Sequence, residues 1–437
     1  MIQVLASIWA LLIGIVFIML GNGMHFTLIG LRGGIEGFSS GELAFVASGY
    51  FMGFLSGARL SPMLIRRVGH VRVFAALGSF MSAGLIAFPL LAEPWAWTIL
   101  RLLVGFCMSG IYVTAESWLN DAATNETRGK VLSAYMIAQT LGIIGAQGLL
   151  TFGDAGTAVL FIGASILVSI SFAPILLSVS PVPAAQAVRP MPLRKLFSNS
   201  PLGTVGIFLL GGIYATQAGM GAVYGSQIGL TTPQIALFIA MLFAGALVLQ
   251  YPIGWLSDHM DRRKLIFAAA GAGAAACALG WLTDGEMVYM MAAAFLAGGV
   301  TTPLYALFLA YTNDYLSVEE MPAASGGLVF TFGLGAILGP LAAGWAMESL
   351  GLFAFWVVLG ATFGAIALYA LYRMSRRAPI PVAETESYLS VLPTASPVAV
   401  EAAGAWAAEN AEAARDAEDE ADAEADAEEG AEADAKS

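Results

Sequence analysis

The sequence contains twelve long apolar stretches, and their length restricts the fold more than any other feature. Each has about 20 or more mostly apolar residues, the length that a helix needs to cross about 30 Å of hydrocarbon. Only 11% of the 437 residues are charged and 58% are apolar, so a soluble core could not hide this surface. We predict an all-α membrane protein with twelve membrane-spanning helices, at residues 5–31, 42–65, 71–92, 96–119, 129–153, 157–179, 202–228, 233–256, 263–283, 286–311, 323–347 and 351–373.

The stretches form two groups of six, separated by a polar segment. Residues 180–201 contain five prolines and three basic residues, which is typical of a linker. We therefore predict an N-terminal six-helix bundle at residues 1–179, a cytoplasmic linker at 180–201 with a short helix at 191–197, and a C-terminal bundle at 202–377. An offset of 193 residues supports two parallel repeats, because it aligns Gly105 with Gly298, Tyr112 with Tyr305, and Asn120-Asp121 with Asn313-Asp314.

The distribution of basic residues predicts the orientation. Short cytoplasmic loops accumulate lysine and arginine. If both termini are cytoplasmic, the opposite side receives Arg32 alone. The cytoplasmic side then receives Arg66, Arg67, Arg72, Arg128, Lys130, Arg189, Arg194, Lys195, Arg262, Arg263, Lys264, Arg373, Arg376 and Arg377.

The net charge of -12 comes from the C-terminal tail. Residues 1–377 hold 17 basic and 15 acidic residues, whereas residues 378–437 hold 2 basic and 16 acidic residues. We expect residues 378–437 to form a disordered acidic cytoplasmic tail, because alanine alternating with acidic residues offers little surface to pack. A regulatory or cation-attracting role is the alternative. The chain has no basic patch interleaved with aromatic residues, so we expect no nucleic-acid binding.

Residues that could hold a metal or act as nucleophiles are few and scattered. Cys107 and Cys277 lie inside apolar stretches of different halves, and His25, His70 and His259 are far apart in the sequence. Small buried cysteines of this kind are usually packing residues. We expect no metal site, no cofactor and no enzymatic activity.

A loop motif between residues 254 and 264 carries the first family resemblance. It runs Gly-Trp-Leu-Ser-Asp-His-Met-Asp-Arg-Arg-Lys, and it resembles the Gly-x-Leu-x-Asp-x-x-Gly-Arg-Arg loop of the major facilitator superfamily. Asp261 replaces the usual glycine, and the first-half copy has Pro62 in place of the aspartate. The resemblance implies a fold of two pseudo-symmetric six-helix bundles, and it assigns Asp258, Arg262 and Arg263 to a cytoplasmic gate.

A longer stretch resembles the YcaD-like branch of bacterial facilitators. It comprises Ile-Tyr-Val-Thr-Ala-Glu-Ser-Trp-Leu-Asn at residues 111–120, Thr-Arg-Gly-Lys-Val-Leu-Ser-Ala-Tyr at residues 127–135, Gly142 and Gln147. Tyr-Pro-Ile-Gly at residues 251–254 also fits this branch.

Two charged residues in the fourth stretch are candidates for coupling or gating. Arg101 matches the Arg-x-x-x-Gly pattern that the resemblance links to proton coupling, and the alternative is a structural hydrogen-bonding arginine. Glu116 lies about 22 Å further along the same helix, where it could pair with Arg128 or the Arg66-Arg67 cluster. The alternative for Glu116 is a proton-carrying carboxylate.

The resemblance also implies that the stretches at 5–31, 96–119, 202–228 and 286–311 line a central cavity. Few polar residues of these stretches are charged, which favours a neutral, zwitterionic or amphipathic solute. His25 could titrate near neutral pH, although we favour an interhelical hydrogen bond. The candidate substrate-binding residues are Asn22, His25, Tyr112, Tyr214, Gln217, Tyr224, Thr301, Thr302 and Tyr305.

Glycines in the eleventh stretch have the spacing of closely packed membrane helices. Gly335, Gly339 and Gly344 recur at intervals of four or five residues. Small residues at such spacings let helix backbones approach one another. We therefore expect this stretch to make close helix contacts.

These features together predict a secondary active transporter that works by alternating access. We expect a monomer in the bacterial inner membrane, with both termini cytoplasmic and protons as the coupling ion. The alternative is a membrane sensor of the same fold that signals through its cytoplasmic tail. The sequence does not specify the solute or the direction of transport.

Overall fold

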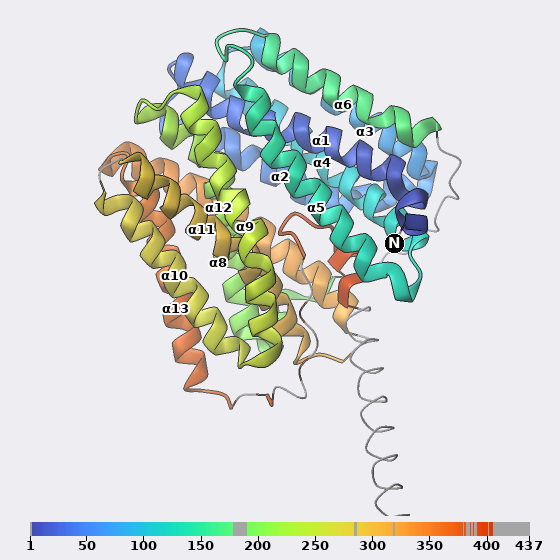
Figure 1. Cartoon of the computed structure of the whole chain (residues 1–437), viewed down its shortest axis with the longest axis vertical. Coiled ribbons are helices and arrows are strands. Elements are labelled where there is room, and N and C mark those ends of the chain that lie inside the picture. Colours follow the sequence, from blue (N-terminus) through green and yellow to red (C-terminus); the bar gives the residue numbers. More distant parts are fainter. Residues whose placement is uncertain are drawn as a thin grey trace, which may run out of the picture.

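Helices are the regular secondary structure of the part of the chain that the computed structural model describes (Figure 1). That part comprises residues 2–177, 190–283, 286–317, 320–378, 380, 381, 385, 388, 391–400 and 402–404. The helices are α1 (Ile2–Ile35), α2 (Ser40–Val68), α3 (His70–Ala87), α4 (Pro94–Ala122), α5 (Asn125–Leu150), α6 (Val159–Leu177), α7 (Leu193–Asn199), α8 (Pro201–Gln227), α9 (Thr232–His259), α10 (Arg262–Leu282), α11 (Met287–Asn313), α12 (Met321–Leu350) and α13 (Ala354–Met374).

Eleven of these helices are long and apolar enough to cross a membrane. The described part of α6 offers a shorter apolar stretch, Val159–Pro174, at the place of the sixth predicted span. The short helix α7 lies where the linker helix was predicted. The predicted class, an all-helical multi-pass membrane protein, is confirmed.

Helices α1 to α6 pack mainly on one another, and so do helices α8 to α13. In the first set α2 packs along α4, and α1 packs along α5 and α6. In the second set α8 packs along α12, α9 along α11, and α10 along α13. Figure 1 shows the blue-to-teal set and the yellow-to-orange set on opposite sides of the molecule. The sets meet where α1 contacts α8, α2 contacts α12, and α5 contacts α9.

The two ends of the helix assembly differ, and we name each after one residue. The Gly37 end contains the turn between α1 and α2, where Gly37 has a φ of 78° that suits glycine. The Arg262 end contains the loop between α9 and α10 and the end of α13. Successive helices alternate in direction, so every connection belongs to one end or the other.

At the Gly37 end the two sets touch directly. The Ser40 hydroxyl donates a hydrogen bond to Gln227 over 2.7 Å, and the Ser48 hydroxyl donates to the Ile337 carbonyl over 2.8 Å. A Cβ atom at Gly344 would lie 2.7 Å from the Ser40 carbonyl oxygen, closer than real Cβ atoms approach. The glycine of α12 therefore lets the backbone of α2 come near, as expected for small residues at membrane helix interfaces.

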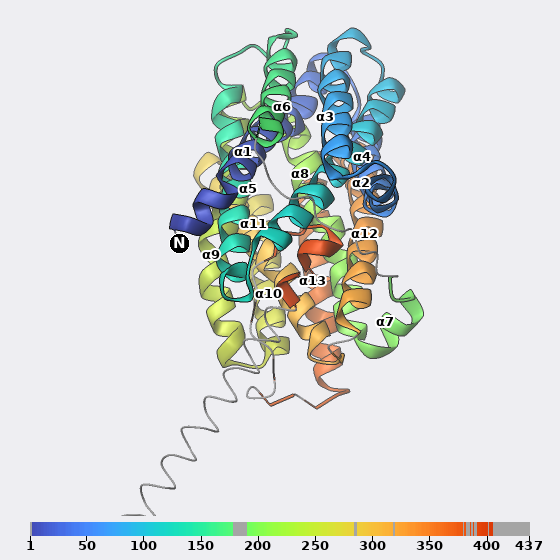
Figure 2. The same cartoon turned by 90° about the vertical axis from the view of Figure 1, so that its right-hand side faces the viewer.

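At the Arg262 end a piece of the C-terminal tail lies between the two sets. Residues 391–400 and 402–404, which we call the tail segment, run beside α5 and α4 on one side and the C-terminal helices on the other (Figure 2). Most of their described side chains are buried, including Val391, Ala395, Ser396 and Val400.

This burial corrects the prediction of a disordered tail over residues 378–437. The sequence from 391 to 400 has no charged residue and is rich in valine and alanine. Such a stretch can pack in an apolar space, unlike the acidic repeat that follows it. Residues 405–437, to which the prediction also applied, lie outside the described residues.

Candidate functional site

A cavity lies between the two helix sets, and its wall is mostly apolar and aromatic. The space not filled by atoms, including the part open to solvent, is about 490 Å³. None of the described residues that line it carries a charge. They are Asn22, Gly23, Phe26 and Thr27 of α1, Tyr50 and Phe51 of α2, Tyr112 of α4, Ile143 and Gln147 of α5, Tyr214 and Ala218 of α8, Ile239 and Phe243 of α9, and Thr394 of the tail segment.

A smaller recess adjoins this cavity within the second helix set. It shares Tyr214, Ala218 and Phe243 with the cavity and adds Gln217, Thr301 and Thr302. The Thr301 hydroxyl donates a hydrogen bond to Gln217 Oε1 over 3.1 Å. The recess therefore adds polar residues of α8 and α11 to the lining.

The predicted binding residues separate into two groups. Asn22, Tyr112, Tyr214, Gln217 and Thr301, together with Thr302, line the cavity or its recess. The other three predicted residues, His25, Tyr224 and Tyr305, are not among the lining residues.

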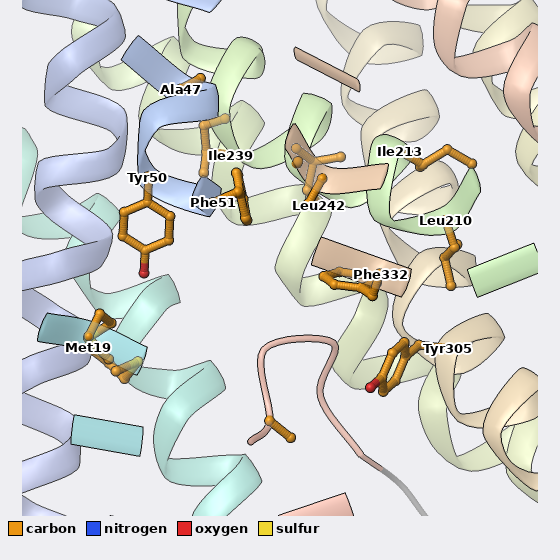
Figure 3. Close-up of a cluster of buried hydrophobic side chains, with 14 of the residues drawn as sticks. Met19, Ala47, Tyr50, Phe51, Leu210, Ile213, Ile239, Leu242, Tyr305 and Phe332 are labelled. Carbon is orange, nitrogen blue, oxygen red and sulfur yellow. The ribbon is translucent and has the colours of Figure 1, made fainter. Parts of the chain in front are cut away.

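Tyr224 and Tyr305 are held by aromatic neighbours. Tyr224 stacks on Phe355 with ring centres 4.7 Å apart and accepts a hydrogen bond from Trp356 Nε1. It therefore joins α8 to α13, away from the cavity. Tyr305 packs edge-on against Phe332, and Figure 3 shows its hydroxyl turned toward the pale red tail loop.

Three further helices contribute wall residues that the sequence interpretation missed. Tyr50 of α2 and Phe243 of α9 are aromatic, and Gln147 of α5 accepts a hydrogen bond from Thr27 over 2.8 Å. The family resemblance pointed only to the stretches that became α1, α4, α8 and α11. A polar glutamine inside an apolar stretch was the available signal, since membrane helices keep such residues off the lipid.

Arg101 lies fully inside the N-terminal set, behind the cavity wall. Its guanidinium carbon is 4.0 Å from the ring centre of Phe26 and 4.7 Å from that of Tyr50, so the charge rests on aromatic faces. Its side chain is 1% exposed. Among the described residues no carboxylate forms an ion pair with Arg101.

His25 completes the surroundings of Arg101. Its Nδ1 lies 3.2 Å from Arg101 Nη1, and because a guanidinium can only donate, this nitrogen must accept and carry no proton. The ring packs edge-on against Phe88 with centres 4.5 Å apart. His25 thus joins α1 to α4 as a neutral side chain.

Glu116 is the buried carboxylate nearest the Arg262 end of α4. Its side chain is 1% exposed and accepts a hydrogen bond from the Tyr135 hydroxyl over 3.0 Å. The second carboxylate oxygen accepts the backbone N–H of Ser396 in the tail segment over 2.8 Å. The expected pairing with Arg128 or with Arg66 and Arg67 is not formed in the part of the chain described, where the tail segment takes that place.

A charged cluster lies at the loop motif of the second set. Arg262 Nη1 lies 2.5 Å from Asp314 Oδ1, both side chains are at most 3% exposed, and Arg262 Nε donates to Ser257 over 3.1 Å. Asp258 Oδ1 is 3.8 Å from Arg262 Nη2, and the Asp258 side chain is 39% exposed. The strong partner of Arg262 is therefore Asp314 of α11, which the sequence analysis used only to align the repeats.

Arg263 is bound separately. It donates to both carboxylate oxygens of Asp261, over 3.0 and 2.7 Å, and to the backbone carbonyl of Arg377 over 2.6 Å. Partial burial would raise the pKa of Asp261, but hydrogen bonds from Arg263 and the charges of Arg263 and Lys264 hold it below its ordinary value of 3.8. The aspartate that replaces the usual glycine thus holds Arg263, which links the start of α10 to the residues that follow α13.

Comparison with known proteins agrees with this geometry. A family model described as Major Facilitator Superfamily matches residues 11–244 and 205–407. The chain belongs to the major facilitator superfamily. The matches together include both helix sets and continue into the tail segment.

Two bacterial relatives narrow the placement within the superfamily. The uncharacterized MFS-type transporter YcaD of Escherichia fergusonii is 25% identical over 381 residues, which cover 85% of this chain and 97% of the relative. The uncharacterized MFS-type transporter YfkF of Bacillus subtilis is 25% identical over 349 residues, covering 74% of this chain and 89% of that protein. The predicted resemblance to YcaD-like facilitators is confirmed, and the chain is a membrane transporter.

Solved structures support the same fold. The crystal structure of the nucleoside transporter NupG, as a D323A mutant, superposes with a TM-score of 0.71 at 14% identity. The superposition covers 83% of this chain and 98% of NupG. At this identity the likeness concerns the fold alone.

Proposed function

We propose that the protein is a secondary active transporter that carries a small neutral, zwitterionic or amphipathic solute by alternating access. The observation that carries the proposal is a cavity between two helix sets that are in direct contact at the Gly37 end. Many of the residues that line it are aromatic, and none of its described lining residues is charged. In such transporters two bundles rock about a central site. Residues 1–179 and 202–377 would form the two moving bundles, joined by the linker at 180–201.

The polar groups on and near the wall support the proposed solute class. Asn22 Oδ1, Gln217 Nε2 and the Tyr305 hydroxyl are buried and have no hydrogen-bond partner among the described residues. Buried polar atoms without partners are costly, so a solute that both donates and accepts hydrogen bonds would be stabilised there. Aromatic rings such as Tyr50 and Tyr214 would cover its apolar faces.

The basic residues favour a cytoplasmic Arg262 end. With both termini in the cytoplasm, the Gly37 end faces outward and is closed by direct helix contacts. Asp258, Arg262, Arg263 and Arg128 then belong to the cytoplasmic gate. Arg32 is the exception at the outer end, and its charge is neutralised by Glu36 at 2.5 Å.

Protons are the proposed coupling ion, with Glu116 as the carrier. Glu116 is buried and engages only neutral donors among the described residues, Tyr135 and Ser396. Protonation would therefore not break an ion pair, and it would lower the cost of burying the side chain. Arg101 is the second candidate, since a cation resting on Phe26 and Tyr50 lies next to the solute cavity.

Reconstitution into proteoliposomes tests this function. We would first screen metabolites, nucleosides included, for those that raise the melting temperature, and then measure their uptake with and without an imposed pH gradient. The account expects uptake that the gradient accelerates and that Glu116→Gln uncouples from it. Ligand binding without uptake under any gradient would reject transport.

The sensor alternative has one observation in its favour. The tail segment lies between the bundles, so a solute in the cavity could displace it and alter the tail. A sensor would bind solute and change the protease sensitivity of the tail, but would carry no flux. Measuring both properties on the same proteoliposomes separates the two functions.

A further inference from the structure

The tail segment has the burial of an integral part of the protein, not of a surface tail. Val400 and Ala403 are 1% exposed, and Ser396 is 2% exposed. Thr394 forms part of the cavity wall itself. The segment therefore occupies the space that leads from the Arg262 end into the proposed solute site.

A buried carboxylate holds the segment at its centre. Glu116 accepts the Ser396 N–H over 2.8 Å and is oriented by the Tyr135 hydroxyl. Each carboxylate oxygen thus has a hydrogen-bond donor, and the residue is 1% exposed. Glu116 of the N-terminal bundle and Ser396 of the tail segment are thus hydrogen-bond partners in a buried position.

The sequence at Ser396 and Pro397 favours a helix start within the tail segment. The Ser396 hydroxyl accepts the Val398 N–H over 3.2 Å, and Pro397 follows as the first residue of a helical stretch. Serine before proline is a common helix start. Ala395, Ala399 and Ala403 have small side chains and are at most 5% exposed.

A second attachment lies upstream, on the family loop motif. The Tyr388 N–H donates to Asp258 over 2.7 Å, and Gln250 Nε2 donates to the Tyr388 hydroxyl over 3.2 Å. A Cβ at Gly254 would lie 2.6 Å from the Tyr388 ring, so this glycine leaves room for the ring. The tail is therefore fixed at Tyr388 before it turns into the cavity.

We propose that the cavity mouth at the Arg262 end is a binding site for the chain's own tail segment, which competes there with solute. The role in transport rests on the proposed function, whereas the binding itself does not. Because the segment lies between the bundles, they cannot approach each other at this end until it leaves. The tail thus holds the transporter open toward the Arg262 end and slows each cycle.

Cysteine cross-linking tests the binding without reference to transport. A Cβ at Gly404 would lie 3.6 Å from the Asn313 side chain, so Gly404→Cys with Asn313→Cys should form a disulfide in a background with Cys107 and Cys277 replaced by alanine. The matched control pairs Gly404→Cys with Ser349→Cys, which is exposed at the Gly37 end. Equal cross-linking of the two pairs would overturn the binding site.

Access to the cavity tests whether the segment blocks it. Ala218→Cys lines both the cavity and its recess, and a maleimide should alkylate it faster in a chain that ends after Arg377. If the tail segment blocks the cavity with a typical coupling energy, its removal should accelerate labelling of Ala218→Cys by about 5-fold to 150-fold. Ser349→Cys, away from the tail, should be labelled at the same rate in both chains. An unchanged rate at Ala218→Cys would overturn the blocking role.

A point variant in the full-length chain gives the same test without truncation. Val400→Glu places a charge at a position that is 1% exposed, which should release the segment and reproduce the fast labelling. Val400→Ala is the matched control and should stay near the rate of the unaltered chain. Once a transported solute is identified, its flux should be higher in Val400→Glu than in the unaltered chain. Absence of flux from every variant would reject the proposed transport, whereas the cross-linking and labelling results would still decide whether the tail site exists.

Discussion

The Gly37 end and the Arg262 end of the molecule differ in what lies between the two bundles. At the Gly37 end the bundles touch through glycines and short hydroxyl side chains, with Gly344 beside the Ser40 backbone. At the Arg262 end the tail segment separates them, and Glu116 binds Ser396 of the tail. The Gly37 end is closed by the bundles themselves, whereas the bundles are kept apart at the Arg262 end by a segment that can be removed.

This difference suggests how the cycle is controlled. Direct helix contacts must break each time the Gly37 end opens, so their strength sets the balance between the two conformations. The tail segment also stabilises the conformation that is open at the Arg262 end. Variants that weaken the contact at the Gly37 end and variants that release the tail segment should therefore shift the balance in the same direction, toward the conformation that is open at the Gly37 end.

The largest expected effect concerns the ion pair within the second bundle. Arg262→Gln would leave Asp314 as a charge at 3% exposure, and breaking a buried pair costs about 3–5 kcal/mol. We expect a much lower melting temperature in detergent. The double variant Arg262→Gln with Asp314→Asn should recover most of the loss.

Arg67→Gln is the matched control in the first bundle, because Arg67 is exposed and should change stability by no more than about 0.5 kcal/mol. If Arg262→Gln and Arg67→Gln lowered the melting temperature equally, the assignment of the buried pair would fail.

The next effect concerns the contact at the Gly37 end. In Gly344→Val the new Cβ would lie 2.3 Å from the Ala44 Cβ, so α2 and α12 must separate. Overpacking of about 1–3 kcal/mol should shift the conformational balance, and flux should fall, by about 5-fold to 150-fold. Gly271→Val, with nothing within 4 Å of its Cβ, should transport normally. Full activity of Gly344→Val would refute the closure at this end.

A smaller effect on stability, but a clear one on coupling, is expected at Arg101. Arg101→Met removes a buried cation that has no carboxylate partner among the described residues, so the melting temperature should stay constant or rise. If Arg101 takes part in coupling, the acceleration of uptake by a pH gradient should fall by about tenfold, the equivalent of about 1.4 kcal/mol. A melting temperature far below that of the unaltered protein would instead assign Arg101 a structural role.

The smallest effect is a dependence of stability on acid pH at Asp261. Its pKa is lower in the folded protein than its ordinary 3.8, so the carboxylate stabilises the fold at pH values above 3.8, and this stabilisation is lost as pH falls through the folded pKa. Asp261→Asn should flatten the decline in melting temperature on acidification. An unaltered acid profile in this variant would show that the link to Arg263 does not contribute.

The fold was predictable because its main signals are local. Apolar stretches of membrane-spanning length and the one-sided distribution of arginines need no knowledge of tertiary contacts. The glycines at 335 and 339 of α12 were expected at a close helix contact, and that is confirmed by their approach to α8.

The site was less predictable because its contacts join residues far apart in the chain. The charge and position of Glu116 led to the prediction of an arginine partner. Its actual partner is the Ser396 backbone N–H, and because every residue except proline has such a group, the sequence could not identify it. The prediction of disorder over the whole of residues 378–437 also overlooked the stretch from 391 to 400, which has no charged residue. A Ser-Pro helix start followed by valine and alanine was the signal that could have separated it.

The most direct test of the account measures distances between spin labels across both ends, in the full-length chain and in a chain that ends after Arg377. Exposed sites on the two bundles serve as label positions, with one pair at the Gly37 end and one at the Arg262 end. The account predicts that removing the tail adds a second population, shorter at the Arg262 end and longer at the Gly37 end. Identical distance distributions in the two chains would contradict it.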